Sequence, residues 1–136
     1  MRTVAIMPMR NVPHECPAPA PLTHLSAIGD IDAAVARSHS SAVLIFKHSV
    51  TCGISAHAYD ELMTVLSDAG PLEAYIVCVQ SDRAVSLEIA QRFGIRHESP
   101  QLLMLVDGNV RWFASHYTLT ASAIRNALNQ APKPEQ

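Results

Sequence analysis

One cysteine, Cys52, stands where the pattern of the sequence changes from a buried strand to a helix. Residues 41–47 form an apolar run of strand length, rich in branched side chains, and the residues from Cys52 to Gly70 carry apolar side chains at helical spacing. The first turn of a helix offers unpaired N–H groups and a partial positive charge, which stabilise an anion. A thiol at this position is therefore expected to be largely thiolate at neutral pH and to act as a nucleophile.

Ser55 lies three residues after Cys52, where a dithiol motif would have its second cysteine. Cys52 thus has no local partner for a disulfide, although the Ser55 hydroxyl can donate a hydrogen bond to the thiolate. A mixed disulfide at Cys52 has to be resolved by the thiol of another molecule or by a distant cysteine of the same chain. The pattern predicts monothiol exchange chemistry with Cys52 and Ser55 as the catalytic pair. The simpler alternative is an ordinary buried cysteine at a helix start.

The other two cysteines have different surroundings. Cys78 lies in an apolar strand, so we expect it to be buried and inert. Cys16 lies in a proline-rich segment and is a less favoured candidate for a resolving thiol. Three distant cysteines are too few for a disulfide scaffold, which favours reduced thiols and a cytoplasmic location.

Length and composition limit the function classes. A chain of 136 residues that is 49% apolar and 16% charged fits one compact domain. The net charge of −2 gives no general attraction to nucleic acid or to an anionic membrane. No apolar run reaches the roughly 18 residues needed to span a bilayer. Pro8 and Arg10 end the short apolar run at the N-terminus, so no signal peptide is expected.

Seven histidines raise the question of a metal site. His48 and His57 lie near Cys52, but neither takes part in the paired spacings that zinc sites use. We therefore expect no metal site. A protonated His48 could assist the Cys52 thiolate as a nearby cation, and His116 is a candidate residue at the edge of the site.

The remaining patterns predict an α/β fold with the order β-α-β-α-β-β-α, preceded by a short helix that Asp30 or Asp32 caps. Asp82 and Thr120 are expected to cap the later helices, and Asp107-Gly108 to turn a hairpin. Two parallel strands, a hairpin and a closing helix make a four-stranded mixed sheet with helices on both faces. This is the topology of the thioredoxin fold. The expected organisation is a flexible arm over residues 1–22, a domain over 23–131 and a flexible tail over 132–136.

Ser99-Pro100 precedes the third strand, where proteins of this topology carry a cis proline beside the active cysteine. We therefore expect a cis bond here. The backbone of Ser99 would then be available to pair with the backbone of an incoming peptide or thiol, in the manner of strand addition.

Three separated strings in this order resemble the monothiol bacilliredoxins, thioredoxin-like proteins of the bacillithiol system with a T-C-P-I-S motif. The strings are Lys-His-Ser-Val-Thr-Cys-Gly-Ile-Ser at 47–55, Gly-Ile-Arg-His-Glu-Ser-Pro-Gln at 94–101 and Trp-Phe-Ala-Ser-His-Tyr at 112–117. The resemblance covers about residues 24–130. It implies that Cys52 removes bacillithiol from S-thiolated proteins in the cytoplasm, with the small thiol as co-substrate and no tightly bound cofactor. The residues expected to contact substrate are Thr51, Gly53, Ile54, Ser99, Pro100, His48 and His116.

Two departures from the family pattern leave alternatives open. Gly53 stands where the family has proline, and the arm with Cys16 lies outside the pattern. Cys52-Gly53-Ile54-Ser55 also differs by one residue from the C-G-F-S motif of monothiol glutaredoxins, which carry a shared [2Fe–2S] cluster. The alternatives are therefore a cluster carrier of that kind or a thioredoxin-fold binding module without turnover.

Overall fold

The computed structural model describes residues 16–132. The elements are β1 (Leu22–His24), α2 (Ile28–Arg37), β2 (Val43–His48), α3 (Gly53–Asp68), β3 (Glu73–Cys78), α4 (Arg83–Phe93), β4 (Gln101–Val106), β5 (Asn109–Ser115), the 3-10 turn η3 (His116–Thr118) and α5 (Ala121–Gln130). From β2 onward this order confirms the β-α-β-α-β-β-α prediction.

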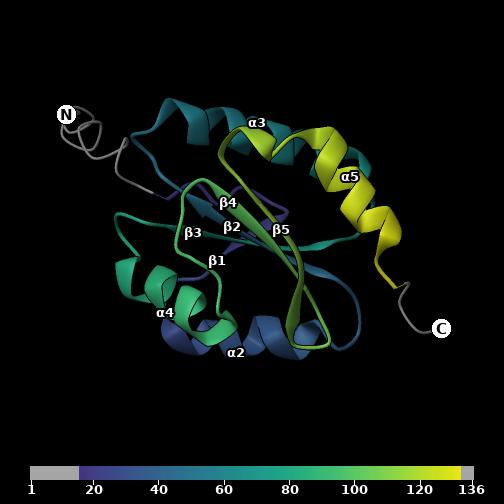
Figure 1. The fold of residues 1–136 in the computed structure, drawn as a ribbon, viewed down its shortest axis with the longest axis horizontal. Coiled ribbons are helices and arrows are strands. Elements are labelled where there is room, and N and C mark those ends of the chain that lie inside the picture. The colour runs from purple at the N-terminus through teal and green to yellow at the C-terminus, as the bar shows by residue number, and fades with distance from the viewer. Residues whose placement is uncertain (1–15, 133–136) are drawn as a thin grey trace, which may run out of the picture.

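The strands form one mixed sheet in the order β1-β3-β2-β4-β5. β1, β3 and β2 run parallel, whereas β4 is antiparallel to both β2 and β5. α3 and α5 cover one face of the sheet, and α2 and α4 cover the other (Figure 1). The α/β fold with helices on both faces is therefore confirmed, although the sheet has five strands and not four.

The additional strand β1 corrects the expected boundary at residue 22. Leu22 is buried and pairs with Ala74, and the N–H of Leu25 donates to the carbonyl of Ile76 at 2.9 Å. No sequence pattern predicts β1, because a strand of three residues is too short for an alternating pattern and Pro21 directly precedes it. Residues 1–15 of the expected arm and 133–136 of the expected tail lie outside the described residues.

The sheet separates two hydrophobic clusters. Side chains of β2 alternate between them, so that Leu44 and Phe46 pack under α3 and α5 whereas Val43 and Ile45 pack against α2 and α4. Every residue of β2 and of β4 is buried. Burial of each large apolar side chain stabilises the fold by about 1.5–3 kcal/mol. The central strands therefore hold the loops at their ends in fixed positions.

Several predicted turns and caps are confirmed. Asp107 and Gly108 have positive φ (53° and 81°), as a tight hairpin between β4 and β5 requires. The Thr120 side chain accepts a hydrogen bond from Ala123 N–H and caps α5. The Ser99-Pro100 peptide bond is cis, as the topology predicted.

Two predicted helix caps are wrong in detail. Asp82 is the N-cap residue of α4 but makes no capping hydrogen bond, because its carboxylate faces His24 and the backbone of Cys78 instead. Asp30 lies inside the first turn of α2 and accepts bonds from the N–H groups of Ser26 and Ala27.

Within residues 16–132, no helix combines the length and the apolar character that crossing a lipid bilayer would require.

Candidate functional site

Cys52 is the N-cap residue of α3. Its backbone is extended (φ −112°, ψ 125°), and its carbonyl accepts a hydrogen bond from Ala56 N–H at 3.0 Å. The thiol is free and half-buried, and it makes no capping hydrogen bond. The partial positive charge of the helix start therefore acts on a sulfur atom that is free to react. The predicted position at the strand-to-helix junction is confirmed.

The Ser55 hydroxyl is not directed as expected. Its Oγ accepts the N–H of Ser49 at 2.9 Å and lies 2.8 Å from His48 Nδ1, and the side chain is fully buried. Within the described residues no hydrogen bond joins Ser55 to Cys52. Ser55 instead ties the start of α3 to the end of β2, because it lies on the inward face of the first helical turn.

His48 is a buried, neutral group and not the cation that the sequence suggested. Burial lowers the pKa of His48 below its ordinary value of 6.5, so the imidazole carries no charge at neutral pH. Its ring stacks on Phe46, with ring centroids 5.5 Å apart, and lies beside Tyr59 at 5.4 Å. His48 thus contributes packing and a hydrogen bond to Ser55.

Sequence reasoning missed Gln80, which holds the loop before Cys52. Gln80 Nε2 donates to Ser49 Oγ at 2.8 Å and to Thr51 Oγ1 at 3.2 Å, and Gln80 Oε1 accepts the N–H of Val50 at 3.2 Å. A single side chain from the β3–α4 loop therefore fixes three successive residues. No motif marks Gln80, and only the parallel pairing of β2 with β3 brings it there.

Pro100 and His116 lie at the same end of the sheet as the Cys52 loop. Gln101, directly after Pro100, pairs with Lys47 of β2 and with Ser115 of β5. The carbonyl of Pro100 accepts the N–H of His116 at 3.0 Å, and η3 packs against α3. The structure thus gathers three loops around the start of α3.

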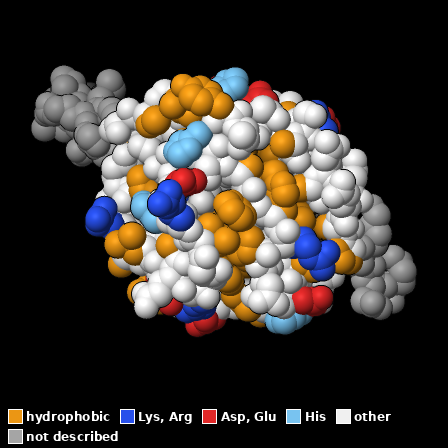
Figure 2. All heavy atoms as spheres, in the orientation of Figure 1, with side chains coloured by type: hydrophobic (Ala, Val, Ile, Leu, Met, Phe, Trp, Pro, Cys, Tyr) orange, Lys and Arg blue, Asp and Glu red, His pale blue; other side chains and the backbone are white. Residues whose placement is uncertain are grey.

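The predicted contact residues differ in their exposure. His48, Ser55 and Pro100 are buried, whereas the others are exposed or half-buried at the surface. These surface residues are Thr51, Gly53, Ile54, Ser99 and His116. Tyr117, next to His116, adds a large apolar side chain that is 75% exposed. In the space-filling view, apolar side chains bordered by histidines gather at the upper edge of the molecule (Figure 2).

Lys47 lies on the opposite face of the sheet from His48 and is fully buried. Burial lowers the pKa of Lys47 to about 8. Its Nζ lies 3.2 Å from Nδ1 of His97, and the pKa of His97 is lowered by burial and then by the charges of Lys47 and Arg83. The His97 side chain is thus engaged with Lys47.

A hollow of about 870 Å³ lies away from this site. Its lining comes from the start of β3, the end of α3 and the end of α5, among them Glu73, Asp68 and Asn129. Cys52 follows the carboxyl end of β2, at the other end of the sheet. The hollow and the Cys52 site therefore lie at opposite ends of the sheet.

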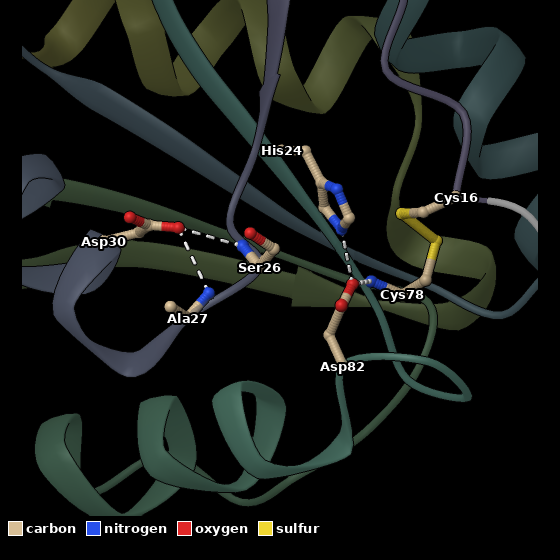
Figure 3. A network of polar contacts seen from close by, with 7 residues as sticks. All are labelled: Cys16, His24, Ser26, Ala27, Asp30, Cys78 and Asp82. Carbon is tan, nitrogen blue, oxygen red and sulfur yellow. Dashed lines mark hydrogen bonds and ion pairs between the residues drawn. A yellow bond between two sulfur atoms is a disulfide. The ribbon is translucent and has the colours of Figure 1, made fainter.

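The expectation of three reduced thiols is wrong, because Cys16 and Cys78 form a disulfide (Figure 3). Cys78 is fully buried, as predicted, and Cys16 packs against the core from the segment before β1. Cys16 is thus bonded to Cys78 in this structure and is not held as a resolving partner for Cys52. The two cysteines are separated by 62 positions in the sequence, and only the folded sheet brings them together, so the pairing could not be predicted from their spacing.

Comparison with solved structures defines the class of protein. The chain superposes on thioredoxin from Fasciola hepatica with a TM-score of 0.67 at 12% identity, covering 82% of this chain and 100% of that one. It also superposes on thioredoxin from Malassezia sympodialis with a TM-score of 0.64 at 18% identity, covering 86% and 96%. These likenesses show that the chain has a thioredoxin fold.

One match of higher sequence identity and one family model define the family within the thioredoxin fold. A structure described as an oxidoreductase with a thioredoxin fold is 32% identical, with a TM-score of 0.72, and the match covers 78% of this chain and 92% of that one. The model of the monothiol bacilliredoxin family, BrxC, matches residues 23–124. The chain therefore belongs to the monothiol bacilliredoxin family, and it is a thiol oxidoreductase that uses a thiol co-substrate.

Proposed function

We propose that this protein removes a small thiol, bacillithiol, from S-thiolated proteins through a mixed disulfide at Cys52. The observation that carries the proposal is the free, half-buried thiol of Cys52 at the N-cap of α3, with a serine three residues later. Membership of the monothiol bacilliredoxin family supports the choice of bacillithiol.

The reaction proceeds in two exchanges. The Cys52 thiolate attacks the small-thiol sulfur of a protein mixed disulfide, the sulfur–sulfur bond breaks, and the protein thiolate leaves and takes a proton. Cys52 is then joined to the small thiol. A second small thiol, as its thiolate, attacks the small-thiol sulfur of this adduct, which yields the symmetric disulfide of the small thiol and restores the Cys52 thiolate. Since Ser55 offers no sulfur, the external thiol is obligatory.

The surface residues around Cys52 would form the contact area for the substrate. Thr51, Gly53 and Ile54 flank the thiol, and the Ser99 backbone would pair with the extended chain of the protein substrate. His116, exposed beside Tyr117, would border the small thiol. The buried residues His48, Ser55 and Pro100 would position these groups without touching the substrate.

The test is the transfer of a bacillithiol label from a model protein to this one. Wild-type protein should gain one adduct at Cys52, seen by intact mass and peptide mapping, and added bacillithiol should release it. Cys52→Ser should gain none. Transfer that persists in Cys52→Ser, or an adduct that only another small thiol releases, would overturn the proposal. Visible absorbance bands after anaerobic iron–sulfur reconstitution, lost in Cys52→Ser, would favour a cluster carrier instead.

A cytoplasmic location belongs to the same proposal, because bacillithiol chemistry requires a pool of reduced small thiol. The cysteines do not add support for this location, since Cys16 and Cys78 are paired. Cell fractionation with an antibody to the protein tests the location directly, and recovery in an extracytoplasmic fraction would contradict it.

A further inference from the structure

Side chains from three distant parts of the chain meet beside the disulfide. Cys16 comes from the segment before β1, His24 ends β1, and Asp82 precedes α4. One donor atom from each of these three residues lies within 4.8 Å of the other two. Figure 3 shows the imidazole, the carboxylate and the disulfide directed toward one another.

The contacts within this cluster are specific. His24 Nε2 lies 2.7 Å from Asp82 Oδ2, and the same oxygen accepts the N–H of Cys78 at 3.0 Å. The Asp82 side chain is 7% exposed and the His24 side chain 35%. Asp82 also makes no capping hydrogen bond to α4, although aspartate at an N-cap position usually stabilises a helix in this way. Asp82 is therefore held in place for the cluster and not for its own helix.

Thiolate, imidazole and carboxylate are the ligands that Zn²⁺ takes in proteins, with four of them in a tetrahedral arrangement. Donor atoms around one such ion lie about 3–4 Å from each other, which the separations in this cluster allow with small adjustments. Three of the four ligands, from Cys16, His24 and Asp82, lie within 4.8 Å of one another. The sulfur of Cys78 is bonded to that of Cys16, so opening the disulfide frees a second thiolate next to this group, and a turn of its side chain brings it in as the fourth ligand.

We propose that the reduced protein binds one Zn²⁺ ion through Cys16, Cys78, His24 and Asp82, and that the disulfide is the metal-free state of the same site. Two equivalents of a small thiol reduce the bond, giving two cysteine thiols and one small-thiol disulfide. Zn²⁺ then binds the two sulfurs and displaces their two protons. His24 turns its Nε2 from Asp82 to the ion, and the carboxylate coordinates beside it.

This site is separate from the family's exchange chemistry. Cys16 lies outside residues 23–124, the range that matches the family model, and Cys52 takes no part in the cluster. The proposal therefore does not depend on the proposed function of Cys52.

The test titrates Zn²⁺ into the fully reduced and the fully oxidised full-length protein, anaerobically and after removal of the reductant. Reduced protein should bind one equivalent, and oxidised protein should bind none at this site. Co²⁺ as a substitute probe should give thiolate-to-metal charge-transfer bands of an intensity expected for two sulfurs in a tetrahedral site. Equal binding by the oxidised protein, or Co²⁺ spectra without these bands, would overturn the proposal.

Variants locate the ion. Cys16→Ser, His24→Gln and Asp82→Asn should each weaken binding by about tenfold or more. Cys52→Ser and His57→Ala, which change a cysteine and a histidine outside the cluster, should bind as the wild type does. Full affinity in Cys16→Ser, or loss of binding in Cys52→Ser, would place the ion elsewhere and refute the assignment. Circular dichroism checks that each variant is folded. If a cysteine variant does not fold, Asp82→Asn provides the test of the site.

Discussion

Two sulfur centres stand at the same end of the sheet and differ in almost every property. Cys52 is half-buried and unpaired, and Gln80 from the β3–α4 loop holds the loop before it. Cys78 is fully buried and is bonded to Cys16, whose sulfur lies near His24 and Asp82 from other elements. The first centre has the exposure and the helix end that a nucleophile needs, and the second has the burial and the ligand types of a structural site. Reactivity therefore follows the surroundings of a sulfur and not the presence of cysteine.

The largest expected effect is on the rate of thiol exchange, when the sulfur of Cys52 or that of Cys16 is removed separately. Cys52→Ser should lower the rate of thiol exchange by about 100-fold or more, because it removes the nucleophile. Cys16→Ser should retain most of this activity. The measurement is the release of a labelled small thiol from a model protein mixed disulfide. Comparable losses in the two variants would show that the centres act as one unit.

Breaking the disulfide should mainly affect stability. A bond that closes 62 positions of chain reduces the entropy of the unfolded state, and Cys16→Ser should lower the free energy of unfolding by about 4 kcal/mol. Urea unfolding monitored by circular dichroism measures the loss. Wild-type protein unfolded with a reductant is the matched control and should approach the stability of the variant. If the reduced wild type is as stable as the oxidised wild type, the entropic role of the bond is contradicted.

Lys47 tests how much the burial of a charged group lowers the free energy of unfolding on the face of the sheet opposite His48. Its pKa is lowered from 10.5 to about 8, so between these pH values the unfolded chain binds a proton that the folded chain does not. The wild type should therefore gain stability as pH rises through this interval. Lys47→Met should be more stable than the wild type at pH 7, and the difference should shrink by about 3 kcal/mol as pH rises above 10.5. A difference that is constant across urea titrations at pH 7, 9 and 10.5 would contradict the shift.

Gln80 tests whether exchange at Cys52 depends on a loop that is held in one position. Gln80→Ala removes three hydrogen bonds to residues 49–51 and should slow exchange with a protein mixed disulfide by about fivefold. Alkylation of Cys52 by iodoacetamide, which needs no ordered loop, should change less. Gln91→Ala on the exposed side of α4 is the matched control. An equal effect of Gln80→Ala and Gln91→Ala on exchange would exclude a positioning role.

Substitution of Gly53 should have the smallest effect of these changes, and it acts on the free energy of unfolding. Nothing lies within 4 Å of a Cβ built at Gly53, and the residue opens α3, where proline is favoured. Gly53→Pro restores the family residue and should raise the free energy of unfolding by up to about 1 kcal/mol, because it restricts the unfolded chain. Thermal unfolding measures it, and Ala33→Pro in the interior of α2 should lower the free energy of unfolding instead. A loss of stability in Gly53→Pro would show that the loop needs a freer backbone.

The two centres also differ in how far the sequence predicted them. The Cys52 thiol and the helix that it caps come from one continuous segment, so the change of hydrophobic pattern at residue 52 was enough to place the thiol at a helix start. Topology then predicted the cis bond before Pro100. Where the prediction failed, the direction of a side chain was decided by tertiary partners. Ser55 bonds to His48 and Ser49, and neither contact follows from the spacing of Cys52 and Ser55.

The disulfide cluster could not be predicted in the same way. Cys16 meets Cys78 only because β1 adds to the edge of the sheet beside β3, and β1 leaves almost no pattern in the sequence. Asp82 has the ordinary signature of a helix cap, and its contact with His24 depends on the same edge strand. The contacts made by Gln80 depend in turn on the pairing of β2 with β3.

The bond between Cys16 and Cys78 turns five elements, from β1 to β3, into a covalent ring, and Cys52 lies inside this ring. A protease that cuts once within the ring leaves both pieces attached until a reductant is added. Every assay that supplies a small thiol to recycle Cys52 also exposes the ring bond to that thiol. Turnover numbers therefore refer to a mixture of open and closed molecules unless the same assay is run on Cys16→Ser.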